Sequence, residues 1–317
     1  DDPVTTRRGD QAVHVRAPGK INLALRVGPL AADGYHRLVN VFQAVSLYED
    51  VVARPAPGIS VSVSGRHADA VPLGDRNLAV QAARLLADSA GIVTGVDLHL
   101  TKGVPTAGGM GGGSADAAAT LLACDVLWDT GLARDELAEL AAELGADVPF
   151  ALTGLTAVGT GRGDVLSPVL ARGTFHWVLA LQGSGLSTAS VFRRFDERHS
   201  GEVPEPQLSA ELMAALRSGE ASALAPHLVN DLQAPALDLV PHLADVLAAA
   251  GDAGALAQIV SGSGPTVVAL AANHAQAEDI AGRLRSADVA DEVLVVSGPT
   301  PGARVLESMR GGAPVPP

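Results

Sequence analysis

Residues 105–116 read Pro-Thr-Ala-Gly-Gly-Met-Gly-Gly-Gly-Ser-Ala-Asp and carry the strongest structural signal in the chain. An alternating apolar run, residues 96–100, precedes this glycine loop, and a helix-like run, residues 115–129, follows it. Glycine lacks a Cβ, so the N–H groups of such a loop can approach a polyanion closely. The N-terminus of the next helix adds free N–H donors and the positive end of the helix dipole. The segment therefore predicts a phosphate-binding loop between a strand and a helix.

The glycine loop differs from two common phosphate motifs. No Gly-Lys-Ser/Thr follows it, which excludes a Walker A loop, and it does not read Gly-x-Gly-x-x-Gly on a first strand. Glycine clusters also occur in plain flexible loops, but the strand before it and the helix after it favour phosphate binding. Ser114 is expected at the start of the helix, either as the N-cap or with its hydroxyl directed at phosphate or Mg²⁺.

The composition is ordinary for a globular protein and excludes several other classes of protein. The 317 residues are 47% hydrophobic and 18% charged, and the length favours two domains. A net charge of -13 argues against nucleic acid or an anionic membrane as a partner. The single cysteine, Cys124, excludes an intramolecular disulfide and a cysteine metal site. Residues 1–10 lack the apolar region of a signal peptide, and the sequence has no apolar stretch of about twenty residues that would form a transmembrane helix. A cytoplasmic enzyme is therefore expected.

A change of pattern near residues 165–172 divides the chain into two parts. The first part shows strand-like and then helix-like runs, at 14–17, 21–27, 39–46, 50–54, 59–64, 77–90, 115–129 and 134–144. Pro18-Gly19-Lys20 is expected to be a turn between the first two strands. The second part shows a buried-type strand at 175–181, helices at 188–195, 209–216 and 240–250, and a strand-strand-helix-strand ending over 255–296.

These runs predict an α+β protein with an antiparallel sheet and helices on one face of it in the second part. The expected domains are residues 11–168 and residues 169–310. Residues 1–10 and 311–317 are expected to be disordered tails.

Four segments resemble, in this order along the chain, a superfamily of small-molecule kinases. They are Ala17-Pro18-Gly19-Lys20-Ile21-Asn22, the glycine loop, Gly145-Ala146-Asp147-Val148-Pro149-Phe150 and Val260-Ser261-Gly262-Ser263-Gly264-Pro265-Thr266. The superfamily comprises galactokinase, homoserine kinase, mevalonate kinase and phosphomevalonate kinase (GHMP kinases), and the resemblance spans nearly the whole chain. It implies an enzyme that uses ATP and Mg²⁺. It also implies an N-terminal domain like domain 2 of ribosomal protein S5 and a C-terminal ferredoxin-like domain.

The resemblance assigns catalytic roles to Asp147 and Lys20. Asp147 matches the aspartate that acts as general base on the acceptor hydroxyl, and Lys20 matches the lysine that pairs with it. An ammonium within about 4–6 Å favours the ionised carboxylate, which is the form that accepts a proton. From the residues alone, Lys20 could be a surface lysine with its stem on the strand, and Asp147 could be a helix-stop aspartate that caps a turn.

The resemblance also implies which residues bind the nucleotide. The phosphate contacts are expected from Pro105, Gly108, Gly109, Met110, Gly111, Gly112, Gly113 and Ser114. Lys102 and Asn77 match residues on the adenine side. A second glycine loop, formed by Ser261, Gly262, Ser263 and Gly264, is implied to close the active site over the phosphates. Ser114 is the one candidate side chain for contact with Mg²⁺.

The segment Asp33-Gly34-Tyr35-His36 indicates which acceptor substrate the kinase uses. It is similar to the branch of the superfamily that phosphorylates a cytidine diphosphate-linked methylerythritol in the non-mevalonate route to isoprenoids, as are residues 186–192 and 230–233. The implied acceptor contacts are Asn22, Tyr35, His36, Thr188 and Phe192. Tyr35 and Phe192 would stack on the two faces of the cytosine, and His36 would hydrogen-bond its edge. On the residues alone, either aromatic side chain could be a core anchor.

Departures from the pattern keep other functions open. Met110 replaces a leucine, Ala115 replaces a second serine, and Ala189 replaces a proline, which leaves the placement of Phe192 open. The alternatives are another GHMP kinase, such as a homoserine or sugar kinase, or a non-catalytic nucleotide sensor of the same fold. The chain is expected to act as a monomer or homodimer. The tripeptide Arg162-Gly163-Asp164 resembles an adhesion motif and is interpreted as a chance occurrence.

Overall fold

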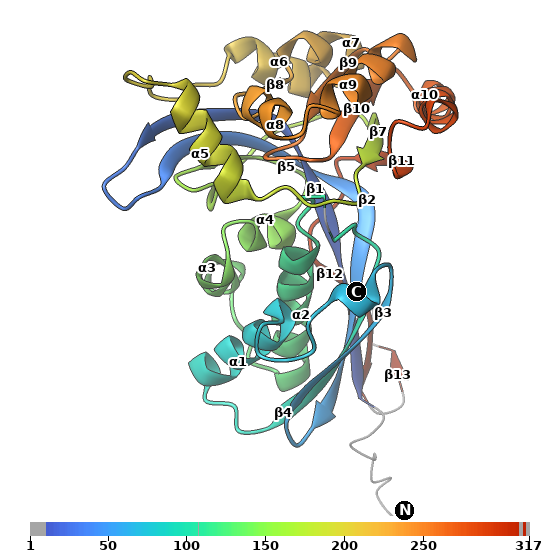
Figure 1. The fold of residues 1–317 in the computed structure, drawn as a ribbon. Coiled ribbons are helices and arrows are strands. Elements are labelled where there is room, and N and C mark those ends of the chain that lie inside the picture. The colour runs from blue at the N-terminus through green and yellow to red at the C-terminus, as the bar shows by residue number, and fades with distance from the viewer. Residues whose placement is uncertain (1–10, 107, 311–312, 315–317) are drawn as a thin grey trace, which may run out of the picture.

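The computed structural model describes residues 11–106, 108–310 and 313–314, which form two sheets with helices packed against them (Figure 1). In these residues the first sheet has nine strands, with the main order β13-β12-β1-β2-β4-β3. Its strands are β1 (Ala12–Leu30), β2 (His36–Ala56), β3 (Ile59–Gly65), β4 (Gly95–Lys102), β5 (Thr156–Thr160), β6 (Val165–Pro168), β8 (Val229–Asn230), β12 (Arg304–Arg310) and β13 (Ala313–Pro314).

Helices cover one face of this sheet (Figure 1). They are α1 (Leu78–Ala90), α2 (Gly112–Trp128), α3 (Arg134–Leu144) and α4 (Val148–Thr153). The apolar face of α1 includes Leu86, which is buried with Leu98 of β4 and Leu121 of α2 in one cluster. Burial of such side chains is the main stabilising contribution to the domain. Cys124 is buried in the same cluster, as expected for a small apolar side chain.

The second sheet is antiparallel, with the order β11-β7-β10-β9. Its strands are β7 (Phe175–Leu181), β9 (Ala257–Val260), β10 (Val267–Ala271) and β11 (Glu292–Gly298). The helices of this half are α5 (Thr188–Arg198), α6 (Ala210–Ser218), α7 (Ala221–Leu224), α8 (Gln233–Leu239), α9 (Leu243–Asp252) and α10 (His274–Ala287). Short 3₁₀ turns occur at Ala68–Ala70 and Ala225–His227.

Residues of the two halves share one buried apolar cluster. Ile21 and Leu23 of β1 lie in one buried cluster with Trp177 and Leu179 of β7. The indole N–H of Trp177 also donates a hydrogen bond of 2.9 Å to the side-chain oxygen of Gln43 in β2. Residues contributed by both halves therefore hold fixed positions relative to one another.

The Pro18-Gly19-Lys20 segment is not the turn expected from the sequence. β1 runs through it without a break, and its pairing with β2 shifts register between Pro18 and Gly19. A bulge of this kind accommodates a proline that has no N–H to donate. A Cβ on Gly19 would lie 3.1 Å from the methyl groups of Val104. Glycine at this position therefore lets the segment after β4, which contains Val104, approach β1 closely.

The C-terminal part of the chain returns to the first sheet. β12 pairs antiparallel with β1, although the expected domain range of 169–310 assigns it to the second half. This pairing joins residues far apart in the sequence, so no local sequence pattern predicts it. Of the expected tails, residues 313–314 form β13, while residues 1–10, 311–312 and 315–317 lie outside the described residues.

Several helices and strands coincide with the sequence-based ranges. α3 covers residues 134–144 and β7 covers residues 175–181, as predicted. The short helices α4 and α8 were not predicted, because six or seven residues show too little of the helical period. None of the helices in the described part of the chain combines the length and the hydropathy that crossing a membrane requires.

Candidate active site

The glycine loop joins β4 to α2, as the sequence predicts. Gly109 and Gly111 have φ angles of 67° and 75°, a backbone region that side chains with a Cβ rarely adopt. Gly111 is the N-cap of α2, so Ser114 lies in the first turn and the expectation that it caps the helix is wrong. This N-cap has a left-handed conformation with a φ of 75°, which glycine adopts readily and serine rarely adopts. The Ser114 hydroxyl has no hydrogen-bond partner among the described residues.

Contacts from both halves of the protein fix the glycine loop. The Met110 carbonyl accepts a 2.9 Å hydrogen bond from the backbone N–H of Lys20, and the Gly108 carbonyl accepts one of 2.9 Å from the Thr266 hydroxyl. A Cβ on Gly109 would lie 3.4 Å from the Gly264 carbonyl oxygen, so the two glycine loops are in close contact. The described part of the loop is therefore held in place, and backbone N–H groups in such a loop suit an anion such as phosphate.

Lys20 and Asp147, far apart in the sequence, lie side by side. The Lys20 Nζ is 3.7 Å from Asp147 Oδ2 and donates a 3.0 Å hydrogen bond to Asn22 Oδ1. The Lys20 side chain is 11% exposed and that of Asp147 36% exposed. Asp147 precedes α4 without a side-chain capping hydrogen bond in the described structure, so helix capping does not account for it. A carboxylate with a free oxygen beside a buried ammonium is a suitable general base.

Asn22 fixes the position of the Lys20 ammonium. Its side-chain N–H donates a 2.7 Å hydrogen bond to Asn40 Oδ1, which leaves its own oxygen directed at Lys20. The backbone N–H of Asn22 donates a 3.0 Å hydrogen bond to the hydroxyl of Ser261 in the second glycine loop. Asn40 was not identified from the sequence, since its partner lies on the neighbouring strand.

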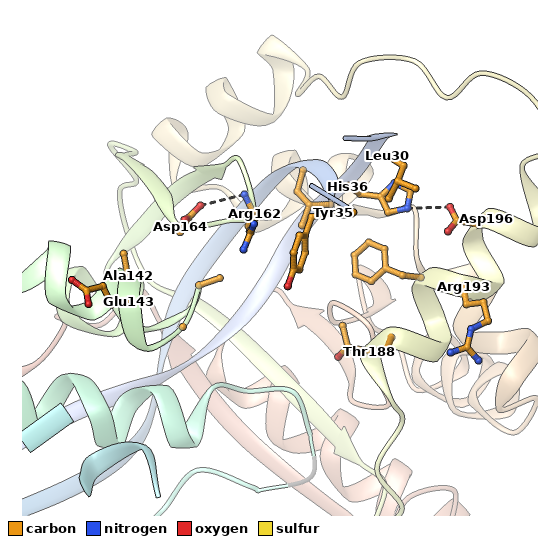
Figure 2. Close-up of a pocket in the computed structure, with 16 residues that line it drawn as sticks. Leu30, Tyr35, His36, Ala142, Glu143, Arg162, Asp164, Thr188, Arg193 and Asp196 are labelled. Carbon is orange, nitrogen blue, oxygen red and sulfur yellow. Dashed lines mark hydrogen bonds and ion pairs between the residues drawn. The ribbon is translucent and has the colours of Figure 1, made fainter. Parts of the chain in front are cut away.

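A cavity of about 780 Å³ lies next to this pair and contains most of the expected acceptor residues (Figure 2). Its lining includes Tyr35, His36, Thr188 and Phe192, but not Asn22, which faces Lys20 instead. The backbone of Gly145 and Ala146, immediately before Asp147, forms part of the wall. The cavity is thus bounded by the β1–β2 connection, the α3–α4 connection, the β5–β6 connection and α5.

The aromatic residues of the cavity have different environments. Tyr35 is 54% exposed, which excludes the core-anchor alternative for it. Phe192 stacks on the ring of buried His36 with a centroid distance of 5.5 Å and an interplanar angle of 18°. Ring stacking of this kind holds both side chains in place beside the open cavity.

The nitrogens of His36 both lie close to protein oxygens. Nδ1 is 2.8 Å from the Gly28 carbonyl oxygen, and Nε2 is 3.0 Å from Asp196 Oδ1. A ligand that bonds to Nε2 must therefore share it with Asp196 or displace that carboxylate. Asp196 lies one helical turn after Phe192 on α5, a spacing from which its presence at this site could have been predicted.

The side chains of Lys102 and Asn77 are directed at protein groups. Lys102 Nζ is 3.0 Å from Glu49 Oε1 and also bonds to Asp116 Oδ2, and its side chain is only 2% exposed. Asn77 caps α1 by accepting from the Ala79 N–H at 2.8 Å, and its side-chain N–H donates to the Pro72 carbonyl. If these two residues contact a nucleotide in this conformation, the backbone must make the contact.

The Glu49–Lys102–Asp116 cluster lies beneath the glycine loop. Glu49 accepts 3.3 Å hydrogen bonds from the N–H groups of Gly103 and Val104, and a Cβ on Gly112 would lie 2.9 Å from its Oε1. Burial raises the pKa of Glu49 to about 8, and the charge of Asp116 adds to this effect, while Lys102 opposes it. Burial also raises the pKa of Asp116. Two carboxylates share one cation, so the cluster retains a proton at pH values where the unfolded chain releases it.

This cluster predicts that folding stability falls as the pH rises. Glu49 has an ordinary value of 4.5 and a raised folded pKa of about 8, so the folded state binds more protons than the unfolded state between these limits. The slope from Glu49 is at most about 1.4 kcal/mol per pH unit. Urea unfolding from pH 4.5 to 8 should show this loss in the wild type and a flatter profile in Glu49→Gln. The exposed Glu139→Gln is the control, and an unchanged slope in Glu49→Gln contradicts the prediction.

Comparisons with known proteins agree with this geometry. Residues 77–155 match the family described as GHMP kinases N terminal domain, and residues 212–290 match GHMP kinases C terminal. The 4-diphosphocytidyl-2-C-methyl-D-erythritol kinase of Leifsonia xyli subsp. xyli is 57% identical over 304 residues, which cover 93% of this chain and 99% of the relative.

Solved structures extend the comparison to the fold. A crystal structure of 4-(cytidine 5′-diphospho)-2C-methyl-D-erythritol kinase matches with a TM-score of 0.73 and 33% identity, covering 90% of this chain and 98% of that one. A homoserine kinase from Cytophaga hutchinsonii matches with a TM-score of 0.74 over 96% of this chain and 99% of that one. At 19% identity, this second likeness shows the fold alone. The predicted two-domain α+β kinase fold is confirmed.

Proposed function

Because the chain belongs to the 4-diphosphocytidyl-2-C-methyl-D-erythritol kinase family of the GHMP kinases, we propose that it phosphorylates the 2-hydroxyl of 4-diphosphocytidyl-2-C-methyl-D-erythritol. The chain is an ATP-dependent kinase, and the proposed reaction is a step of the non-mevalonate route to isoprenoids. The observation that carries the proposal is the position of the Lys20–Asp147 pair. Lys20 bonds to the glycine loop through its backbone, and Asp147 adjoins the wall of the cavity.

In the proposed reaction Asp147 accepts the proton of the acceptor hydroxyl. Phosphoryl transfer depends mainly on positioning and charge stabilisation, together with a group that orients or deprotonates the nucleophile. The Lys20 ammonium, 3.7 Å from Asp147, attracts the carboxylate and adds positive charge beside the glycine loop. Asn22 keeps that ammonium in place through a hydrogen bond.

The residues around the glycine loop fit the phosphates of ATP. Gly109 and Gly111 have positive φ angles, and the loop leads directly into the N-terminus of α2. A helix N-terminus that follows a glycine-rich loop can bind phosphate through backbone N–H groups, and the missing Cβ atoms let the anion approach closely. Mg²⁺, when bound, neutralises phosphate charge. The Ser114 hydroxyl is the side chain proposed to contact it. In the described residues no group of three or more His, Cys, Asp or Glu side chains could hold a metal, so phosphate and water would supply most ligands.

The cavity is proposed to bind the cytidine diphosphate part of the acceptor. The exposed ring of Tyr35 and the stacked pair Phe192–His36 line the same cavity, which supports stacking of a base between Tyr35 and Phe192. Stacking alone accepts any base, so selection of cytosine requires polar contacts such as the His36 ring nitrogen near Asp196.

A coupled ADP-release assay tests the proposal. Purified protein with Mg·ATP should release ADP when 4-diphosphocytidyl-2-C-methyl-D-erythritol is added, but not with homoserine, galactose or mevalonate. Release with one of those three acceptors would replace the proposal by another GHMP kinase activity. If the protein binds ATP but releases no ADP with any acceptor, a non-catalytic nucleotide sensor would be favoured instead.

A further inference from the structure

We propose that Arg162 is a positioning residue for the base of the acceptor, because its guanidinium covers one face of Tyr35 and leaves the other face open for stacking. This inference rests on the proposed function and deepens it. It also gives a role to the Arg162-Gly163-Asp164 tripeptide, which the sequence suggests is a chance occurrence.

The contact between Arg162 and Tyr35 is close and oriented. The guanidinium carbon lies 3.7 Å from the centroid of the tyrosine ring, well inside the range of a cation–π interaction. Arg162 Nη2 donates a 3.2 Å hydrogen bond to Asp33 Oδ2, and Asp33 Oδ1 accepts a 3.0 Å bond from the backbone N–H of Tyr35. Asp33 thus holds both the arginine and the tyrosine backbone.

The β5–β6 connection presents Arg162 in this position. Asp164 Oδ1 accepts a 3.2 Å hydrogen bond from the backbone N–H of Arg162 (Figure 2). Gly161 and Gly163 on either side have φ angles of 69° and 98°, which side chains with a Cβ rarely adopt. The conformation of the connection therefore places the arginine at the cavity.

The two faces of Tyr35 differ in what lies opposite them. In Figure 2, Arg162 lies on one side of Tyr35, and the labelled α5 residues Thr188, Arg193 and Asp196 lie on the other. α5 also carries Phe192, which stacks on His36. The face of Tyr35 opposite Arg162 is thus the one toward the labelled residues of α5, the helix that also carries Phe192.

An exposed tyrosine near the end of a hairpin needs such support. Tyr35 is 54% exposed, so few packing contacts restrict its rotamers. Ordering a side chain on binding costs free energy, and a side chain that is already ordered lowers this cost. Arginine suits this role because its planar guanidinium stacks on aromatic faces. The Tyr35 N–H and the Arg162 guanidinium lower the pKa of Asp33, so the aspartate that joins them stays charged at neutral pH.

Steady-state kinetics of Arg162→Met test the inference. We expect the KM for the cytidylylated acceptor to rise about three- to tenfold, with kcat and the KM for ATP changed less than about twofold. The matched control is Arg84→Met, since Arg84 and Arg162 are both 49% exposed and both paired with an aspartate, and Arg84 has no aromatic contact among the described residues. Arg84→Met should leave all three constants at wild-type values.

A double-mutant cycle with Tyr35→Leu separates positioning from a general structural effect. If Arg162 acts through the ring, Arg162→Met should raise the acceptor KM little further in the Tyr35→Leu background. An unchanged KM in Arg162→Met, or an equal rise in both backgrounds, overturns the inference. If the wild type does not phosphorylate the acceptor and does not bind cytidine diphosphate in calorimetry, the proposed function fails and the inference with it. If the wild type phosphorylates the acceptor and binds cytidine diphosphate, a double-mutant cycle without coupling between Arg162 and Tyr35 rejects only the role of Arg162.

Discussion

Asp147→Asn is expected to lower kcat by about 10²- to 10⁴-fold, the usual contribution of a general base. Asparagine keeps the shape of the side chain but cannot take the acceptor's proton. In our proposal the glycine loop binds the phosphates of ATP. The hydrogen bonds that join this loop to Lys20 and Thr266 do not involve the Asp147 side chain. The KM for ATP should therefore stay within about twofold of the wild type in steady-state assays.

Two further variants make this prediction specific. Asp135→Asn removes an exposed carboxylate in the first turn of α3 and should leave kcat unchanged. Lys20→Met removes the ammonium 3.7 Å from Asp147, and its effect should be far from additive with Asp147→Asn because the two groups act as a unit. Wild-type turnover in Asp147→Asn would exclude the general-base assignment.

Lys102→Met is expected to cost about 3–5 kcal/mol of folding free energy. The substitution leaves Glu49 and Asp116 facing each other in the interior, with side chains only 0% and 5% exposed and without the cation between them. Urea unfolding followed by circular dichroism measures the change, and the midpoint should fall while the slope stays constant.

A neutral version of the cluster is the control for Lys102→Met. In Glu49→Gln/Lys102→Met/Asp116→Asn no buried charge remains, and most of the lost stability should return. If Lys102→Met unfolds at the same urea concentration as the wild type, the ion cluster does not support the loop. If the triple variant is no more stable than Lys102→Met, charge is not the reason for the loss.

Some of this site was accessible from the sequence because its signals are local. The glycine loop shows the residues that a close backbone approach requires, and its flanking strand and helix have clear periods. A further signal is that the chain contains only two lysines, Lys20 and Lys102, among its 22 basic Lys and Arg residues. Both lie buried against the glycine loop or its supporting strand, whereas arginine carries the other cationic positions.

Other features depend on contacts between distant parts of the chain. The Pro18-Gly19-Lys20 segment has the local composition of a turn, but pairing with β2 along its whole length makes it a bulge within one strand. The Arg162–Tyr35 contact joins residues 35 and 162, whose connections meet only in the folded protein. Glu49 lacks a local signal as well, since its partners are on β4 and α2.

Phosphorus NMR of the reaction with 4-diphosphocytidyl-2-C-methyl-D-erythritol and Mg·ATP shows directly whether the protein transfers a phosphoryl group to this acceptor. One new phosphomonoester signal is expected on the acceptor, equal in amount to the ADP formed, with the acceptor's diphosphate signals retained. Mass spectrometry of the product should show the addition of one phosphoryl group. Formation of inorganic phosphate with unmodified acceptor would exclude the proposed activity, because it would show ATP hydrolysis instead of transfer to the 2-hydroxyl.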